Sequence, residues 1–370
     1  MSRELIDISQ FDRDSSFYGE IPLLLTIKNF DLASIRARYL KSQDNPSGRT
    51  GSVERREAGK GGVASLKLFN GKLEDCEVLV QLKEPRGIDC KEGLFAFSSE
   101  AKVYVVSDEK VDALEDEWFS YIHTVNFSPW DETRILVSSS GLDCIFELDL
   151  VDHSRVYEWF AWEHGFCEGI DSKTGEALQL TRKPEDAQRF EREGVAHLLI
   201  ENPAGASLPT ANRAAFINSV FYDENDESQI LATFFHEGKV YSIDRNSGLA
   251  VERIGNLSKP HGGRNYGSKF LVTSTGSGEV VIGENQELQI FTVANLEGKP
   301  AGLGDMEWVQ NTVGTGELLI AIDSNRTSFV IVDPVRNLFD MVPYDENWAV
   351  QDAVVGQLSE EKKTLIRQLV

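Results

Sequence analysis

The segment IHTVNFSPWDETRILVSSSGLDCIFELDL (122–150) decides the fold, because INSVFYDENDESQILATFFHEGKVYSIDR (217–245) repeats its pattern. In both segments a polar residue precedes an alternating strand, an acidic turn follows, and two more strands are separated by a small or polar turn. Such alternation between turn residues is typical of strands in an all-β protein. Self-similarity at a fixed spacing indicates a repeat architecture. The two segments therefore predict a repeated unit of β-strands.

Four further segments fit the same pattern with shorter turns. They are RGIDCKEGLFAFSSEAKVYVVS (86–107), HGGRNYGSKFLVTSTGSGEVVIG (261–283), QNTVGTGELLIAIDSNRTSFVIVD (310–333) and QDAVVGQLSEEKKTLIRQLV (351–370). The six units open on Arg86, His123, Asn218, His261, Gln310 and Gln351. Four of the five intervals between these openings lie between 37 and 49 residues. Intervals of about 40–50 residues are typical of the blades of a β-propeller.

We therefore predict an all-β fold, a six-bladed β-propeller that occupies residues 1–370 as one domain. A pair of β-sandwiches is the alternative, since strands and turns alternate there too. The last unit stops after about two strands, which would leave an exposed sheet edge. The N-terminal strands Leu23–Ile27 and Ser34–Tyr39 are predicted to complete the C-terminal blade and close the ring.

Two stretches interrupt the repeat. Residues 41–62 are rich in Gly, Ser and charge and predict a flexible loop. The interval of 95 residues between His123 and Asn218 marks an insertion at 151–214. Within it, residues 183–194 predict a short helix, since Pro184 suits a first turn and Gly194 suits a helix end. An insertion of this size on a propeller face is a candidate lid.

Composition excludes several classes of function. The 370 residues carry a formal charge of −23 and no clustered Lys and Arg, which argues against nucleic acid and against an anionic membrane surface as partners. No apolar run approaches the length of a membrane span. The N-terminus MSRELIDISQFDRD has acidic residues where a signal peptide needs a basic start and an apolar core. These features predict a cytoplasmic protein.

The chain resembles the six-bladed β-propeller superfamily that includes NHL-repeat proteins, streptogramin lyase-like proteins, and the gluconolactonase and strictosidine synthase-like enzymes. The resemblance rests on the six units and on openings such as IHTVNFSP and KPHGG, and it covers nearly the whole chain. In the lactonase-like members, Glu, Asn and Asp side chains hold a divalent metal. Only Asn218 of the six opening residues matches that set, so the resemblance does not imply this metal site in the present chain. It also makes His261 a candidate counterpart of the histidine of the streptogramin lyase-like enzymes.

The six opening residues are polar and are predicted to form a ring at the mouth of the channel. His123 and His261 are candidate acid–base groups or metal ligands, because neutral imidazole does both near neutral pH. Arg86 suits a carboxylate or another oxyanion. Asn218, Gln310 and Gln351 are candidates for orienting a substrate. In the alternative interpretation these groups hydrogen-bond one another and water inside a wet channel.

Residues outside the ring extend the candidate site. His236 lies in a turn between a second and a third strand, and with His123 and His261 it would suit zinc or another imidazole-preferring divalent metal. Arg326 lies in an equivalent turn and is a candidate substrate ligand. Glu163 and His164 follow an aromatic stretch that begins the insertion, and they are candidate catalytic groups. No glycine-rich phosphate loop followed by a helix is found, so no nucleotide cofactor is expected.

Two functions of different classes follow. The first is an enzyme that acts on a small organic molecule, with an anionic group for Arg86, by metal-assisted or histidine acid–base lyase or hydrolase chemistry at the channel mouth. The second is a non-catalytic scaffold that binds a protein partner on a propeller face. An enzyme needs two histidines and an arginine inside its channel, whereas a scaffold does not.

Overall fold

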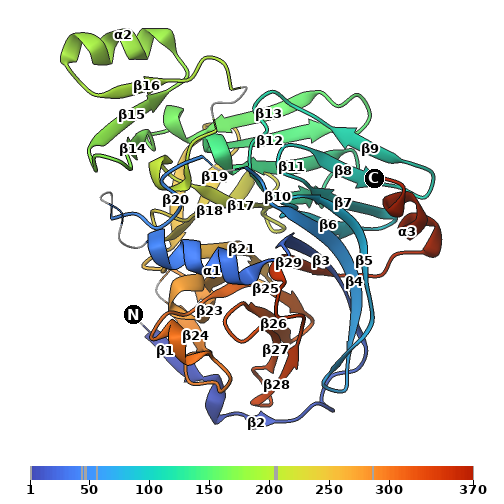
Figure 1. Cartoon of the computed structure of the whole chain (residues 1–370). Coiled ribbons are helices and arrows are strands. Elements are labelled where there is room, and N and C mark those ends of the chain that lie inside the picture. Colours follow the sequence, from blue (N-terminus) through green and yellow to red (C-terminus); the bar gives the residue numbers. More distant parts are fainter. Residues whose placement is uncertain are drawn as a thin grey trace.

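The computed structural model describes residues 2–42, 45, 48–55, 57–203, 207–285 and 287–369. Their regular structure is mostly β-strand, arranged in separate small sheets around a common centre (Figure 1). The chain is thus all-β, as the repeat predicted. No helix in the described part is long and apolar enough to cross a membrane.

Three of the sheets are built from four consecutive antiparallel strands each. The first contains β6 (Ile88–Lys91), β7 (Leu94–Ser98), β8 (Val103–Val106) and β9 (Val111–Leu114). The second contains β10 (Ile122–Phe127), β11 (Arg134–Ser139), β12 (Cys144–Asp149) and β13 (Arg155–Phe160). The third contains β17 (Ile217–Tyr222), β18 (Gln229–Phe234), β19 (Lys239–Asp244) and β20 (Ala250–Ile254).

Two more sheets add an N-terminal strand to the outer edge of four consecutive strands. One contains β21 (Pro260–Tyr266), β22 (Lys269–Ser274), β23 (Glu279–Glu284), β24 (Glu287–Thr292) and, parallel to β24, the strand β1 (Ser2–Asp7). The other contains β25 (Val309–Thr315), β26 (Leu318–Asp323), β27 (Ser328–Asp333), β28 (Leu338–Pro343) and, parallel to β28, the strand β2 (Asp12–Arg13).

The sixth sheet joins the two ends of the chain. Its order is β29 (Ala349–Val355), β3 (Ile21–Asn29), β4 (Lys60–Phe69) and β5 (Lys72–Lys83). The predicted pairing of Leu23–Ile27 with the C-terminal unit is confirmed, because Leu23 faces Val355 and Ile27 faces Val350 across the antiparallel pair. Two other predictions were wrong. Ser34–Tyr39 belongs to helix α1 (Leu32–Lys41), and the last unit has one strand followed by helix α3 (Glu360–Arg367).

The first strand of each of these six sheets contacts the first strand of the next. β6 contacts β10, and contacts continue through β17, β21, β25 and β29, which in turn contacts β6. Apolar side chains fill the space between neighbouring sheets. One cluster, for example, joins Val125 of β10 to Val220 of β17 and Ala96 of β7.

The turn between the second and third strands has a repeated backbone conformation. The residue just before the third strand has a positive φ in four sheets: 52° at Asp143, 65° at Gly238, 67° at Gly278 and 46° at Thr327. Glycine adopts this conformation readily, whereas Asp and Thr do so at a cost. The recurrence shows that the units repeat in backbone geometry as well as in residue pattern.

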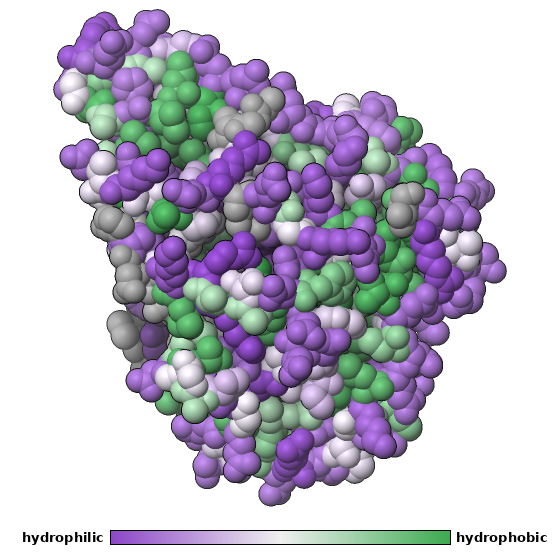
Figure 2. Space-filling view, in the orientation of Figure 1, coloured by the Kyte–Doolittle hydropathy of each residue, from purple (hydrophilic) through white to green (hydrophobic). Residues whose placement is uncertain are grey.

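The insertion is shorter than predicted, because residues 155–160 form β13 and complete the second sheet. The remainder contains a small sheet of β14 (Glu168–Ile170), β15 (Ala177–Thr181) and β16 (His197–Leu199), with helix α2 (Pro184–Glu193) beside it. The predicted helix is confirmed, with Pro184 in its first turn and Gly194 ending it at φ 68°. This subdomain projects from the sheets, and apolar surface gathers on it next to α2 (Figures 1 and 2).

The predicted loop at 41–62 ends where β4 begins at Lys60. Residues 43, 44, 46, 47 and 56 lie outside the described residues, and the flexibility of the loop stays a prediction. The described part is tied to the insertion. The Arg49 side chain donates to the Arg213 carbonyl at 2.5 Å, and the Ser52 carbonyl accepts from Ala211 N at 3.2 Å.

Candidate functional site

One cavity of about 170 Å³ lies where the first strands converge, and we call it the channel-mouth cavity. Five of the six predicted ring residues line it: Arg86, His123, His261, Gln310 and Gln351. Asn218 is equally buried, but it lies outside the lining, and its Nδ2 donates to the Pro260 carbonyl at 2.6 Å. The unit openings thus converge in space although they are spread over 265 residues of sequence.

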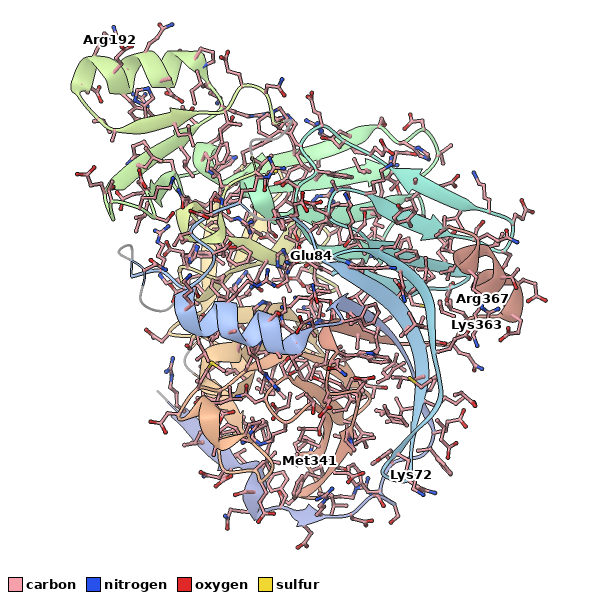
Figure 3. All side chains as sticks on the ribbon, in the orientation of Figure 1. Lys72, Glu84, Arg192, Met341, Lys363 and Arg367 are labelled. Atoms are coloured by element: carbon pink, nitrogen blue, oxygen red, sulfur yellow. The ribbon has the colours of Figure 1, made fainter. Side chains whose placement is uncertain are left out.

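Arg86 is the centre of a hydrogen-bond network at one side of this cavity. Its Nη1 lies 2.9 Å from His123 Nε2 and 3.5 Å from Gln351 Oε1, and its Nη2 lies 3.3 Å from Glu84 Oε2. Glu84 lies near the centre of the molecule, just after the end of β5 (Figure 3). The Glu84 carboxylate is fully buried, so the ion pair holds the guanidinium in a fixed position.

His123 is neutral and fully engaged. Burial, followed by the positive charges of Arg86 and Arg213, holds its pKa well below the usual range. Because Arg86 can only donate, His123 Nε2 must accept, and Nδ1–H therefore donates to the Tyr121 carbonyl at 3.0 Å. His123 is thus a positioning residue for Arg86, and both of its ring nitrogens already have partners.

His261 presents a different arrangement. Its Nδ1 lies 2.9 Å from Thr275 Oγ1 and 3.2 Å from the Lys259 carbonyl. With Nδ1–H donating to that carbonyl, Nε2 carries the lone pair of the neutral ring. Burial lowers the pKa of His261 to about 3, and the charges of Lys28 and Arg86 add to the shift. At neutral pH this imidazole is therefore neutral, with Nε2 available as a hydrogen-bond acceptor.

The residues two positions before the ring residues form the next layer of the site. Glu84, Tyr121, Phe216 and Lys259 have φ values of 41°, 46°, 49° and 55°. None of them is glycine, so each holds a backbone conformation that costs free energy, and such strain clusters at functional sites. Phe216 and Lys259 line the channel-mouth cavity, as does Trp308, two residues before Gln310.

Helix α1 lies across the front of the strands in Figure 1, and its Ile35, Arg38 and Tyr39 line the cavity. Asp31 begins the helix by accepting from Ser34 N at 2.9 Å, and Leu32 and Ile35 are buried against the sheets. Tyr39 then stacks on Trp308 with ring centroids 5.1 Å apart. The Tyr39 hydroxyl lies 2.7 Å from Lys259 Nζ. The predicted strand at this position is therefore a helix whose last turns reach the site.

A smaller second lobe of about 60 Å³ shares Ser52, Arg86, His123, Thr210 and Phe216 with the main cavity. Arg213 lines this lobe, with its guanidinium 4.7 Å from the Phe216 ring centroid and 5.2 Å from that of Tyr121. Thr210 and Arg213 come from the C-terminal end of the insertion. The insertion thus supplies residues to the site, as α1 does, and a lid role for 151–214 stays a prediction.

The charge of the cavity is opposite to that of the protein. Its described lining includes four cationic side chains, Lys28, Arg38, Arg86 and Lys259, and no Asp or Glu. The whole chain carries a formal charge of −23. Arg86 is paired with Glu84, which lies outside the lining, but the surface that faces the cavity is cationic. The cavity is therefore suited to an anion.

Three residues that the sequence placed in the site lie elsewhere. Glu163 lies 2.7 Å from Arg182 Nε, and His164 stacks on Trp159 with centroids 4.9 Å apart. Arg326 is buried among internal partners, with its Nη1 2.8 Å from Asp323 Oδ2. None of the three lines the channel-mouth cavity or its second lobe. The sequence placed these residues in the site because they stand next to aromatic or turn residues, and that pattern does not show which side chains they contact.

The three predicted metal-ligating histidines do not form a ligand set. Within the described residues, no group of three His, Cys, Asp or Glu side chains is placed to hold a metal ion. His236 Nε2 lies 2.8 Å from the Thr210 carbonyl, so it carries the proton, and His123 Nε2 accepts from Arg86. Burial, then Arg49, lowers the pKa of His236 to about 3. These donor sets do not fit a shared cation.

Sequence reasoning missed the aromatic and lysine wall of the cavity. Its members are Lys28, Tyr39, Phe216, Phe235, Lys259 and Trp308. Three of them, Phe216, Lys259 and Trp308, stand two residues before a ring residue in the aligned units. The unit alignment that found the ring would have found these residues if it had been extended by two positions.

No protein-family model and no curated protein matches this chain. Among solved structures, a nidogen/laminin complex is similar with a TM-score of 0.54 and 10% identity, covering 90% of this chain and 97% of the other. A protein of unknown function from Bacteroides caccae has a TM-score of 0.50 and 11% identity, covering 90% and 98%. A streptogramin B lyase has a TM-score of 0.42 and 10% identity, covering 71% and 84%. Together with the radial arrangement of the sheets, the first two likenesses identify the chain as a β-propeller.

Proposed function

We propose that this chain binds a small organic anion in the channel-mouth cavity and acts on it by acid–base lyase or hydrolase chemistry. The observation that carries the proposal is the charge of the lining, four cations and no carboxylate among the described lining residues, in a protein of charge −23. Selection for solubility alone places cations on the surface, where water screens them. Of the four cations at the cavity, Lys28 and Arg86 are buried and Lys259 is half-buried, and this arrangement favours an anionic ligand.

We also propose that the six sheets are six blades that close into a ring. The support is the succession of contacts between first strands, from β6 to β29 and back to β6. The antiparallel pair of β29 and β3 joins the N-terminal and C-terminal segments in one sheet. This arrangement positions the ring residues, because each one comes from the start of a first strand or from just before it.

His261 is the group that exchanges a proton in this proposal. Burial lowers the pKa of His261 most, and the charges of Lys28 and Arg86 lower it further, since both disfavour the imidazolium. A bound anion offsets those charges, so the pKa of His261 rises when the ligand arrives. The base therefore becomes competent only with an anion in place.

The same cations stabilise the product of proton removal. When Nε2 takes a proton from the carbon next to a carboxylate, negative charge builds up on the carboxylate oxygens. Lys28 and Arg86 flank His261 and offset that charge through preorganised electrostatics. Elimination of a leaving group from the adjacent carbon would complete a lyase reaction. If the ligand carries an ester, water that gives its proton to Nε2 would instead attack the ester carbonyl, and the C–O bond would break as the alcohol leaves with that proton.

The test compares His261→Asn with His164→Ala, a matched control whose imidazole lies outside the cavity. Small carboxylates and esters are incubated with each protein and followed by proton NMR, and binding is followed by calorimetry. We expect His261→Asn to lose turnover by about 10²-fold or more while still binding anions, with His164→Ala unchanged. Full turnover in His261→Asn would refute the catalytic role. Failure of every anion to bind the parent protein would refute the proposed function and leave the protein-binding scaffold.

A further inference from the structure

Four of the cations that line the main cavity and its second lobe form two groups at different walls, while Arg38 of the main cavity and Arg55 of the second lobe, where Glu54 also lies, belong to neither group. At the first wall, Lys28 Nζ lies 5.2 Å from the Trp308 ring centroid, and Lys259 Nζ lies 4.8 Å from that of Tyr39. Tyr39 and Trp308 stack on each other, so both ammonium groups lie at one aromatic pair. We call this set the lysine pole.

The second wall carries Arg86 and Arg213, which we call the arginine pole. Both guanidinium groups lie against the Tyr121 ring, at 5.9 Å for Arg86 and 5.2 Å for Arg213. Both also lower the pKa of His123, which lies in contact with Arg86. Arg86 lines both the main cavity and the second lobe, so this pole lies at the junction of the two.

An apolar and imidazole wall separates the two poles. Phe216 and Phe235 have ring centroids 4.7 Å apart, and Phe235 lies 5.7 Å from the ring of His261. His261 lines the same cavity as Lys28 and Arg86, and its Nδ1 lies 3.2 Å from the carbonyl of Lys259 in the lysine pole. A ligand that spans the cavity therefore meets cation, aromatic surface and cation in that order.

Lys259 of the lysine pole has a neutral partner, the Tyr39 hydroxyl. Within the described residues, the side-chain hydrogen bond of Lys259 is to the Tyr39 hydroxyl at 2.7 Å. Burial lowers the pKa of Lys259, and no acidic neighbour raises it. An anionic ligand group would therefore stabilise the half-buried Lys259 ammonium more than a neutral ligand group would.

From this arrangement, and resting on the proposed function, we infer that the ligand is an organic dianion whose two anionic oxygen groups are separated by a short apolar segment. One group binds Lys28 and Lys259, and the other binds Arg86 and Arg213. The segment between them lies along Phe216 and Phe235, beside His261. Carboxylate and phosphate share the required chemistry at either pole.

The test is calorimetric titration of the full chain with terminal dicarboxylates from succinate to adipate. Monocarboxylates of matching length, and phosphonocarboxylates, form the other arms. We expect the best dicarboxylate to bind at least about tenfold more tightly than its monocarboxylate, since each charge-assisted contact contributes on that scale. A tighter phosphonocarboxylate would assign phosphate to one pole and still support two poles.

Lys259→Gln should remove most of the difference between dicarboxylate and monocarboxylate while leaving monocarboxylate binding at the arginine pole. Lys72→Gln and Arg192→Gln are matched controls, because Lys72 at the start of β5 and Arg192 on α2 lie far from the cavity (Figure 3). Equal binding of both ligand classes to the parent would overturn the two-pole inference and leave the proposed function standing. Absence of binding by any carboxylate or phosphonate would overturn both.

Discussion

Replacing Arg326 by methionine tests whether this residue is structural, as the hydrogen bonds indicate, or a substrate ligand, as its turn position suggested. The Arg326 side chain is 1% exposed and lies between the carboxylates of Asp323 and Glu307, at 2.8 and 3.2 Å. Its Nε and Nη2 also donate to the Leu296 carbonyl at 3.0 and 2.9 Å. Methionine fills similar space but removes all of these donors.

The expected loss in the free energy of unfolding depends on the contacts that Asp323 and Glu307 keep after Arg326 is replaced. Asp323, with a fully buried side chain, keeps the backbone N–H groups of residues 325 and 326 at 2.9 and 3.0 Å. Glu307 keeps Lys299 at 2.6 Å. Breaking a buried ion pair by removing one partner costs about 3–5 kcal/mol, and the surviving contacts place Arg326→Met toward the lower end. The free energy of unfolding should fall by about 3 kcal/mol at neutral pH.

Urea denaturation at pH 7 measures this change, with dicarboxylate titration of the folded variant as the second readout. Burial raises the pKa of Asp323, and Arg326 opposes that rise. Without Arg326 the folded-state pKa climbs further, so the loss of stability should shrink as the pH is lowered and Asp323 becomes protonated. The double variant Arg326→Met/Asp323→Asn should recover part of the loss. A change below about 1 kcal/mol in Arg326→Met, or lost ligand binding with unchanged stability, would refute the structural role.

Two further predictions concern the walls of the channel. Burial, opposed by Arg264, raises the pKa of Asp352 from 3.8 to about 6, so its native state holds a proton that the unfolded state has lost between those values. This contribution to the free energy of unfolding is present at low pH and should fall by about 3 kcal/mol as the pH rises through 6. Urea titrations at a series of pH values measure this fall, and Asp352→Asn should make the free energy of unfolding depend less on pH. The same pH dependence in Asp352→Asn as in the parent protein would contradict the prediction. A Cβ at Gly262, where φ is 70°, would lie 2.0 Å from Asn311 Oδ1, whereas one at Gly267, where φ is 61°, meets nothing within 4 Å. Gly262→Ala should therefore lower the melting temperature clearly more than Gly267→Ala, and equal shifts would show that the channel wall adjusts freely.

The strands could be predicted from the sequence because alternation and turn residues are local signals. In the units from 86 to 107 and from 122 to 150, each expected strand is present. Helix α1 was missed because Ile35, Ala37 and Tyr39 alternate as in a strand, while Leu32, Ile35 and Tyr39 also have helical spacing. Both periods fit a segment of this length, and burial of Leu32 and Ile35 against the sheets decides between them.

The candidate site was predictable to the extent that it repeats. Ring residues share one position in each unit, so alignment of the units brought Arg86, His123 and His261 together. Lys28 and Tyr39 could not be found in this way, because they lie before the first unit and reach the cavity only through β3 and α1. Long-range packing, rather than any local pattern, places these residues in the wall.

The pairing of the N-terminal strands also dictates an order of folding on the ribosome. β1 cannot pair until β24 has been synthesised, and β2 likewise needs β28. β3 needs β29, which ends at Val355. The first sheets to be synthesised in full are those at 88–114 and 122–160, and they can form while the N-terminal segment is still without its partners. The emerging chain must therefore keep the apolar strand at 21–29 from pairing elsewhere until β29 has been synthesised. Nascent chains that stop before β29 should accordingly depend strongly on chaperones, whereas chains that include β29 should not.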